Sequence, residues 1–334
     1  MTLQAEGCSS SMSPKRAERE ASAPWRSRAF GVELELRFPM PVLIATQAST
    51  GAPDCRLELA AEEEIEVGWP REEAQLRGLM SDGKAKFEIH EHARAGYLIN
   101  SSRYGRFRVA HDGTHVRCAP TDPSDWYWWG VLIGQVLPLI AVLHRLEVLH
   151  ASAVAINGRA FAFSGAPGAG KSTLAINLAL GGAELLSDDV TALRADGERV
   201  IAEPGAALVN LRDDQAEQLE RLGTNGLGEI VGQSNKVHLR ADRLAPPAPL
   251  GALYLLDPAA PGESTTIQLL DPLDPRDVLG ATFVPYVSFA DRAIAQLEIA
   301  ALVQRSIPVF RVSVDRDAGP QAFARRIHEH ATTT

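Results

Sequence analysis

The first third of the chain is a series of short segments in which apolar and polar residues alternate. Val32-Glu33-Leu34-Glu35-Leu36 and Leu57-Glu58-Leu59 are examples, and Pro and Gly residues interrupt the series between Phe30 and Val116. Alternation with a period of two places the apolar side chains on one face of a strand. The pattern predicts antiparallel β structure, and we assign residues 25–122 to an N-terminal, mainly β domain.

A turn-forming cluster, Ala119-Pro120-Thr121-Asp122-Pro123, marks the end of this domain, and the periods lengthen after it. Residues 123–334 contain both helical and strand patterns, which predicts an α/β domain. The expected helices are Trp126–His144, a helix from Lys171 through Gly181, Asp291–Gln304 and Pro320–Glu329. The expected strands are Ala153–Ile156, Arg159–Phe163, Ala183–Leu186, Ala252–Leu256 and Val309–Val314.

The segment from Trp126 to His144 contains no charged residue and is about long enough to span a bilayer. It includes Gln135, Pro138 and two glycines, lacks basic flanking clusters, and is followed within a few residues by a strand pattern. These features favour a buried helix, with its aromatic residues in a core or at a domain interface. We therefore expect no membrane span.

The composition is that of an ordinary globular protein, with 334 residues, 45% hydrophobic and 22% charged. A net charge of −9 with scattered basic residues does not provide the basic surface that binds nucleic acid, so no nucleic-acid partner is expected. Cys8, Cys55 and Cys118 are widely spaced and odd in number, which indicates inert thiols in a reducing compartment. Residues 1–24 lack the apolar stretch of a secretory signal, so we expect a disordered tail and a cytoplasmic protein.

One segment matches the G-x-x-x-x-G-K-[ST] pattern of phosphate-binding loops at every fixed position. It is Gly165-Ala166-Pro167-Gly168-Ala169-Gly170-Lys171-Ser172, followed by Thr173. The segment lies between a strand pattern and a helical pattern, as the mechanism requires. In such a loop the backbone N–H groups and the helix N-terminus bind phosphate, the lysine reaches the β and γ phosphates, and the serine hydroxyl binds Mg²⁺. We therefore predict that the segment binds a nucleoside triphosphate and its Mg²⁺, and we expect this nucleotide to be ATP.

The strand before this loop has a predicted antiparallel neighbour. Ala153–Ile156 and Arg159–Phe163 flank Asn157-Gly158, which is a strong signal for a β-hairpin with a two-residue turn. In doubly wound nucleotide-binding folds the neighbours of the loop strand are parallel and are reached through helices. The hairpin therefore predicts a mixed sheet.

Paired carboxylates, Asp188 and Asp189, follow the short strand that ends at Leu186. Phosphoryl transfer needs a carboxylate that holds Mg²⁺ and, for a hydroxyl acceptor, a group that orients the hydroxyl or takes its proton. Such a pair can also serve only as a turn or a helix cap, but beside the loop we interpret it as catalytic. Asp257, at the end of another apolar strand, is a rival metal ligand that we rank second because Pro258 favours a turn.

Several other polar residues carry weaker signals. His90-Glu91-His92 would place two histidines on one strand face without a third ligand, and His328-Glu329-His330 lies at a C-terminus that we expect to fray. We expect solvated surface histidines in both. Arg212, Lys236 and Arg240 lie in a polar, glycine-bearing stretch, where they could meet phosphate or be solvated surface charge.

Leu149-His150, the hairpin, the phosphate loop and Leu186-Ser187-Asp188-Asp189 together resemble the catalytic domain of the HPr kinase/phosphorylase family in order and spacing. The resemblance covers about Leu149 to Leu193. It implies a P-loop catalytic domain with a mixed sheet, in which Lys171 binds the phosphates and Ser172, Asp188 and Asp189 hold the metal. By the same likeness Asp188 is the base toward a seryl hydroxyl, Asp189 assists with metal and acceptor, and His150 steadies charge near the transferred phosphoryl group.

Two departures from the regulatory enzymes of this family bear on its activity here. Thr173 stands where they carry an acidic residue, and Asn210-Leu211-Arg212-Asp213 lacks the glutamate of their Glu-Ile-Arg-Gly signature. These departures do not favour the reverse phosphorylase activity or HPr itself as the acceptor. Arg159–Phe163 and Ile307–Val312 look more like the HPr-kinase-related proteins found with ribosomal peptide-tailoring systems, some of which phosphorylate a precursor peptide.

We therefore expect an ATP- and Mg²⁺-dependent kinase that phosphorylates a serine-type hydroxyl of a peptide or small protein. A nucleotide-gated binding module and a small-molecule kinase are alternatives that the same site permits. The sequence does not determine the acceptor or the oligomeric state, and a homo-oligomer stays open.

Overall fold

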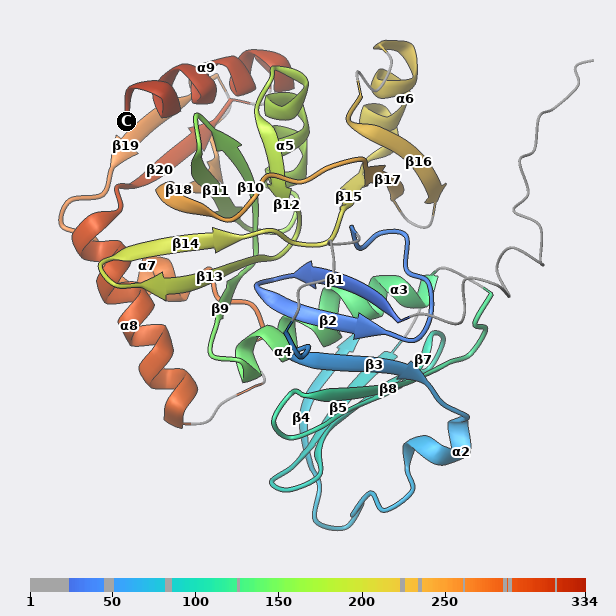
Figure 1. The fold of residues 1–334 in the computed structure, drawn as a ribbon. Helices are drawn as coiled ribbons and strands as arrows, with labels where there is room; N and C mark the ends of the chain where they lie inside the picture. Colours follow the sequence, from blue (N-terminus) through green and yellow to red (C-terminus); the bar gives the residue numbers. More distant parts are fainter. Residues whose placement is uncertain are drawn as a thin grey trace, which may run out of the picture.

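The computed structural model describes residues 24–44, 51–81, 86–124, 127–222, 226–233, 236–260, 262–284, 287, 290–315 and 317–334. The tail expected at the N-terminus lies outside the described residues apart from Pro24, and so do Cys8 and Trp126. The described chain forms a mixed α/β structure with three sheets, and Figure 1 shows an N-terminal sheet on one side of the molecule and a C-terminal sheet with flanking helices on the other.

The N-terminal sheet contains eight strands in the order β1-β2-β3-β8-β7-β6-β5-β4. The strands are β1 (Trp25–Ala29), β2 (Val32–Leu36), β3 (Cys55–Leu59), β4 (Gln75–Ser81), β5 (Lys86–His92), β6 (Gly96–Ser101), β7 (Gly105–Val109) and β8 (His115–Pro120). A short helix, α2 (Glu62–Ile65), follows β3. Both Cys55 and Cys118 are buried in this sheet, and burial raises the pKa of the Cys55 thiol to about 12, which agrees with an inert thiol.

The prediction of purely antiparallel pairing is wrong at one place in this sheet. β3 lies between β2 and β8 and pairs parallel with both. Parallel neighbours cannot be joined by a tight hairpin turn, so β3 cannot follow β2 or precede β8 in a simple meander. Local alternation of apolar and polar residues predicts that a segment is a strand but does not determine its partners.

The segment without charged residues, expected as a helix over 126–144, forms one continuous helix from Tyr127 to Leu143. It consists of α3 (Tyr127–Val131), the π-helix η1 (Leu132–Val136) and α4 (Leu137–Leu143). Most of its apolar residues are buried in one cluster with the side chains of the N-terminal sheet, so the expected buried helix is confirmed. Among the described residues, the structure shows no helix with both the length and the apolar character needed to cross a bilayer. The cluster joins residues on both sides of position 122, and the domain boundary placed there stays a prediction.

The C-terminal sheet contains nine strands and is mixed, as the hairpin predicted. They are β9 (Glu147–Leu149), β10 (Ala151–Ile156), β11 (Arg159–Gly165), β12 (Glu184–Ser187), β13 (Thr191–Asp196), β14 (Arg199–Glu203), β18 (Ala248–Pro258), β19 (Thr266–Leu269) and β20 (Val309–Val314). The hairpin between β10 and β11 turns at Asn157 and Gly158, which both have positive φ, as a tight two-residue turn requires. On its other side β11 pairs parallel with β18, and β18 pairs parallel with β20.

Helices cover both faces of this sheet (Figure 1). α5 (Lys171–Leu180) and α9 (Pro320–Thr333) share one apolar cluster with alternate residues of β11 and β18. α7 (Pro275–Leu279) and α8 (Ala290–Ser306) share another cluster with the intervening residues. A small sheet of β15 (Leu208–Leu211), β17 (Val237–Ala241) and β16 (Gly228–Gln233), together with α6 (Asp213–Leu222), lies beside α5.

The expectation of a frayed C-terminus is wrong. α9 continues to Thr333, and the His330 Nδ1 lies 3.0 Å from the hydroxyl of the buried Tyr254. His330 also packs edge-on against Phe310, with ring centroids 4.5 Å apart. These contacts with the core hold the last turns of the helix in place. The prediction missed them because it considered only the residues near the chain end.

Candidate active site

The glycine-rich loop lies between the end of β11 at Gly165 and the start of α5 at Lys171, as predicted. A side chain at Gly165 could not be accommodated, because its Cβ would lie 2.5 Å from the Leu256 carbonyl oxygen on β18. Gly168 and Gly170 have φ of +81° and +98°, a region that disfavours residues with a Cβ. The glycines are thus required by the path of the loop, which leads the chain to the N-terminus of α5, where an anion is favoured.

Lys171 is buried against this loop. Its Nζ donates hydrogen bonds to the carbonyl oxygens of Gly165, at 2.9 Å, and Ala166, at 3.4 Å. Burial lowers the pKa of Lys171, while Asp189 and Asp188 act in the opposite direction. The ammonium group therefore lies within the electrostatic influence of both aspartates, at the mouth of the loop.

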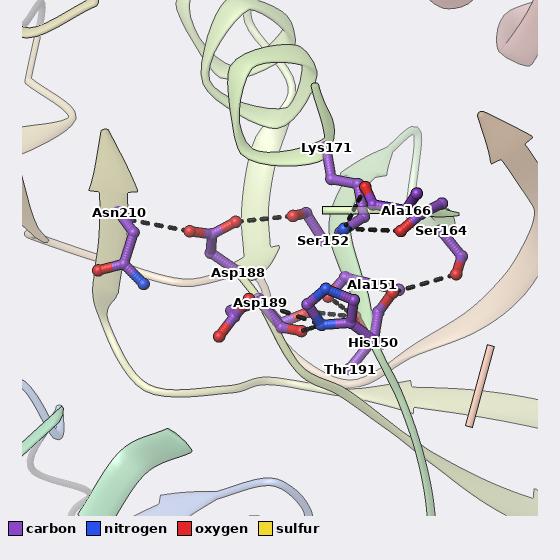
Figure 2. Close-up of polar contacts among 12 residues, drawn as sticks. His150, Ala151, Ser152, Ser164, Ala166, Lys171, Asp188, Asp189, Thr191 and Asn210 are labelled. Atoms are coloured by element: carbon purple, nitrogen blue, oxygen red, sulfur yellow. Dashed lines mark hydrogen bonds and ion pairs between the residues drawn. The ribbon is translucent and has the colours of Figure 1, made fainter. Parts of the chain in front are cut away.

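Asp188 is buried, and both of its carboxylate oxygens accept hydrogen bonds (Figure 2). Oδ1 accepts from the Ser152 hydroxyl at 2.7 Å, and Oδ2 accepts from the Asn210 backbone N–H at 2.9 Å. Burial raises the pKa of Asp188, Asp189 adds to this effect, and hydrogen bonds from Ser152, Asn210 and the Ser172 hydroxyl reduce it. A fixed carboxylate with a raised pKa has the properties of a general base.

Asp189 differs from its neighbour, since its side chain is 41% exposed. Its φ of +66° turns the backbone so that its carbonyl oxygen lies 3.1 Å from the Nδ1 of His150, while its Oδ1 lies 3.6 Å from the same atom. The backbone oxygen is an acceptor, so Nδ1 donates and the Nε2 of a neutral His150 is an acceptor. The Asp188 carboxylate is thus shielded from solvent, whereas the Asp189 carboxylate is partly exposed to it.

His150 is stacked on Phe283, with ring centroids 5.7 Å apart and ring planes at 20°. Burial lowers the pKa of His150, Lys171 contributes in the same direction, and Asp189 opposes them. The imidazole is thus favoured in its neutral form and is held between the backbone of Asp189 and an aromatic ring.

Strand register explains why these residues meet. β10 lies between β11 and β12 and is antiparallel to both, so the end of β11, the start of β10 and the end of β12 lie at the same edge of the sheet. The register places Ala151 opposite Ser164 and Ala153 opposite Ser187. The Ser164 hydroxyl also donates to the His150 carbonyl oxygen at 3.1 Å, which fastens the histidine to the loop strand.

Three residues of the site were not predicted to take part in it. Ser152 carries the hydroxyl that holds Asp188, and its only signal in the sequence is a polar residue within an apolar strand. Asn210 contributes its backbone N–H, and a main-chain donor has no signature in a sequence. Phe283, which supports His150, lies in a segment for which the sequence predicted no role.

Of the other candidates, Asp257 and Arg240 pair with other residues, and Lys236 lies near the cluster. Asp257 is on β18 next to the loop strand, but its side chain is 58% exposed and pairs with Arg311 at 3.7 Å. Leu256 faces α5, so alternation directs Asp257 toward the opposite face of the sheet. Arg240 pairs with Glu229 at 3.0 Å. Lys236 is exposed, and it lies close enough to Lys171 to lower the pKa of that ammonium group.

The predicted absence of a metal site at the two histidine triplets stays a prediction. His90 and His92 lie 3.4 Å and 3.3 Å from the carboxylates of Glu88 and Glu73. No group of three or more His, Cys, Asp or Glu side chains among the described residues could hold a metal ion. This does not argue against Mg²⁺, which is usually bound by one or two carboxylates together with substrate phosphates. The Ser172 hydroxyl, Asp188 and Asp189 offer the oxygen donors that Mg²⁺ prefers.

His238 supports the site from β17, with its Nδ1 2.8 Å from the Oδ1 of Asn210. Burial lowers the pKa of His238 to about 4 from an ordinary value of 6.5, and Lys236 adds to the effect. Between about pH 4 and pH 6.5 the histidine is therefore protonated more in the unfolded chain than in the folded protein. The contribution of the neutral His238 to the free energy of unfolding is complete above pH 6.5, and it is lost as the pH falls toward about 4.

We expect the His238→Gln variant to show a smaller loss of stability on acidification than the unmodified protein, because glutamine can donate to Asn210 without titrating. The measurement is the urea midpoint at about pH 7 and about pH 5. His111→Gln, at an exposed position, is the control and should keep the original pH dependence. Equal pH dependence in all three proteins would contradict the assignment.

Comparison with known proteins gives little support beyond this geometry. No family model matches the sequence, and no curated protein matches it. Among solved structures, the chain is similar to the Hpr(Ser) kinase/phosphatase from Coxiella burnetii at 13% identity, over 56% of this chain and 97% of that one. The TM-score is 0.31, which is too low to carry an argument about the fold or the reaction. The function must therefore be argued from the site itself.

Proposed function

We propose that the chain is an ATP- and Mg²⁺-dependent phosphotransferase whose acceptor is a serine-type hydroxyl of a peptide or small protein. One observation carries the proposal. A glycine loop at a helix N-terminus, a buried lysine and a buried, hydrogen-bonded carboxylate with a raised pKa converge at one edge of a sheet. The loop and the lysine would bind the phosphates, and the adjacent carboxylate would take a proton. Phosphoryl transfer to a hydroxyl requires both.

In the proposed reaction the loop N–H groups and Lys171 bind the β and γ phosphates of ATP. Mg²⁺, which would be held by Ser172, Asp189 and Asp188, neutralises phosphate charge when it is bound. Asp188 takes the proton of the acceptor hydroxyl while the hydroxyl oxygen forms a bond to the γ phosphorus. The bond between the γ phosphorus and the β–γ bridging oxygen breaks, which releases ADP. A neutral His150 supplies a polar contact to the transferred group.

The division of roles between the aspartates follows from their surroundings. Asp188 has the raised pKa and the fixed orientation that suit a base. Asp189 is partly exposed, so it can bind a hydrated Mg²⁺ at a lower desolvation cost. We therefore assign proton transfer to Asp188 and most of the metal binding to Asp189.

The test combines a binding and a transfer measurement. We expect the protein to bind a fluorescent ATP analogue in the presence of Mg²⁺ and to transfer label from γ-labelled ATP to serine-containing synthetic peptides. Lys171→Met should weaken nucleotide binding and abolish labelling, because it removes the ammonium group from the loop.

The outcomes separate the alternatives. Label on a small metabolite in place of peptides would identify a small-molecule kinase, and nucleotide binding without any transfer would identify a nucleotide-gated binding module. Absence of nucleotide binding would overturn the proposal altogether.

A further inference from the structure

A cleft of about 290 Å³ opens on the side of Asp188 and Asp189 that faces the N-terminal sheet. Its volume is at the lower end of the range for ligand pockets, which suits one or two side chains better than a whole nucleotide. The phosphate loop does not line it. Its walls come from the β1–β2 turn, the N-terminal sheet, the α3–η1 helix and the β15–β17 sheet, so both halves of the chain contribute to one site.

The cleft combines polar and apolar lining residues. The polar ones include Asp188, Asp189, Asn210, Lys236 and His238. The apolar wall carries Phe30, Phe87, Tyr104, Tyr127 and Ile133. Apolar and aromatic walls with a few placed polar groups are typical of sites that bind organic ligands.

Two contacts support the aromatic part of this wall. The rings of Phe87 and Tyr104 are stacked, with centroids 6.1 Å apart. Phe30 lies at the tip of the β1–β2 turn with φ of +52°, an unusual conformation for a bulky residue, and its N–H donates to the Pro204 carbonyl oxygen at 2.7 Å. The turn thereby holds a buried aromatic side chain of the N-terminal sheet next to the candidate catalytic carboxylates.

The helix that lines the cleft is irregular at this place. η1 is a π-helix over Leu132–Val136, a rare geometry that is found frequently at functional sites. Gly130 and Gly134 both line the cleft, and a Cβ built at either would meet nothing within 4 Å. Neither glycine needs positive φ or close packing, and glycine is less favourable than alanine inside a helix. The glycines keep space open in the cleft, which points to an occupant.

We propose that this cleft is the acceptor site, in which the hydroxyl-bearing residue of a peptide reaches Asp188 and an uncharged, apolar or aromatic neighbouring side chain lies against the Phe87–Tyr104 wall. The inference rests on the proposed phosphotransferase function. The position of the cleft favours this occupant over the nucleotide, because the phosphate loop does not line the cleft and the two aspartates lie between the loop and the apolar wall. The cleft also continues directly from the carboxylate that takes the proton.

The experiment uses the full chain and two pools of synthetic serine peptides that differ only next to the serine, where one pool carries Phe or Leu and the other Gly or Asp. We expect the unmodified protein to label the apolar pool at least tenfold more efficiently. Gly134→Phe should fill the cleft, raise KM for the apolar pool at least tenfold and remove the preference. Gly134→Ala should have a smaller effect, and Leu297→Phe, at an exposed position on α8, should have none.

Nucleotide affinity and thermal unfolding are measured for the same variants. A Gly134→Phe protein that binds nucleotide normally but loses the preference supports the acceptor site, and Gly130→Leu provides a second test if Gly134→Phe does not fold. If the unmodified protein labels both pools equally, or if Gly134→Phe keeps the preference for the apolar pool, the proposal that the cleft is the acceptor site is wrong, while the proposed phosphotransferase function still stands. Weakened nucleotide binding in Gly134→Phe would show that the cleft holds the nucleotide base, which also overturns it. Absence of label on every peptide overturns the proposed function and the acceptor site together.

Discussion

Asp188→Asn is expected to slow phosphoryl transfer by about 10²–10⁴-fold, the usual contribution of a general base, while nucleotide still binds. The substitution keeps the size of the side chain but removes its ability to accept a proton. The measurement is the rate of peptide labelling at saturating ATP, together with the affinity for a fluorescent ATP analogue. Full activity in this variant would disprove the assignment of the base.

The same variant should also be less stable, for a reason that the hydrogen bonds make clear. An asparagine oxygen can accept from the Ser152 hydroxyl, but its amide group would then face the Asn210 N–H, and two donors cannot pair. An unsatisfied buried donor costs about 1–3 kcal/mol, so thermal unfolding must be checked before the activity is interpreted. Asp257→Asn is the matched control, since Asp257 is exposed and paired with Arg311, and it should retain transfer within about twofold.

Arg292→Met is expected to lower the free energy of unfolding by about 3–5 kcal/mol, the cost of breaking a buried ion pair. The side chains of Arg292 and Glu147 are each only 3% exposed, and Arg292 Nη2 lies 3.2 Å from Glu147 Oε1. Burial already raises the pKa of Glu147, and Arg292 opposes that effect, so the variant would leave a buried acid without its cation. Urea unfolding followed by circular dichroism measures the loss.

Arg292 also donates hydrogen bonds to the carbonyl oxygens of Phe283, Val284 and Val287. The Glu147→Gln/Arg292→Met double variant should therefore recover only part of the loss, because these carbonyl groups stay without their donor. Arg276→Met removes the cation of an exposed pair with Asp274 and should leave stability unchanged within error. If the single Arg292→Met variant had the same free energy of unfolding as the unmodified protein, the Arg292–Glu147 pair would not stabilise the fold.

The sequence predicted those parts of the site that depend on local chain geometry. The Asn157-Gly158 turn, the strand that ends at Gly165 and the helix that starts at Lys171 each follow from a few adjacent residues, and all three are present. Asp188 and Asp189 were placed beside the loop from their spacing, and the structure brings Asp188 within hydrogen-bonding reach of Ser172.

Features that depend on distant pairing were not predictable in this way. The parallel position of β3 requires knowledge of which strands meet, and the Asn210 N–H reaches Asp188 only because the small sheet packs beside α5. The cleft combines Phe30, Gly134 and Asp188, which are far apart in the sequence and each ordinary in its own segment. Hydrophobic patterns report which face of an element is buried but not which other element covers it.

The hairpin of β10 and β11 has one further consequence. Because the two-residue turn fixes the register, the start of β10 and the end of β11 form one rigid unit. His150 directly precedes β10 and is joined to this unit by the hydrogen bond from the Ser164 hydroxyl to the His150 carbonyl oxygen. Any displacement of the loop when an anion binds would thus be transmitted to the imidazole as a motion of one body. The hydrogen bonds from the Ser152 hydroxyl to Asp188 and from His150 to the Asp189 carbonyl oxygen would pass the same motion on to the two aspartates, so that histidine, loop and carboxylates would keep their mutual geometry.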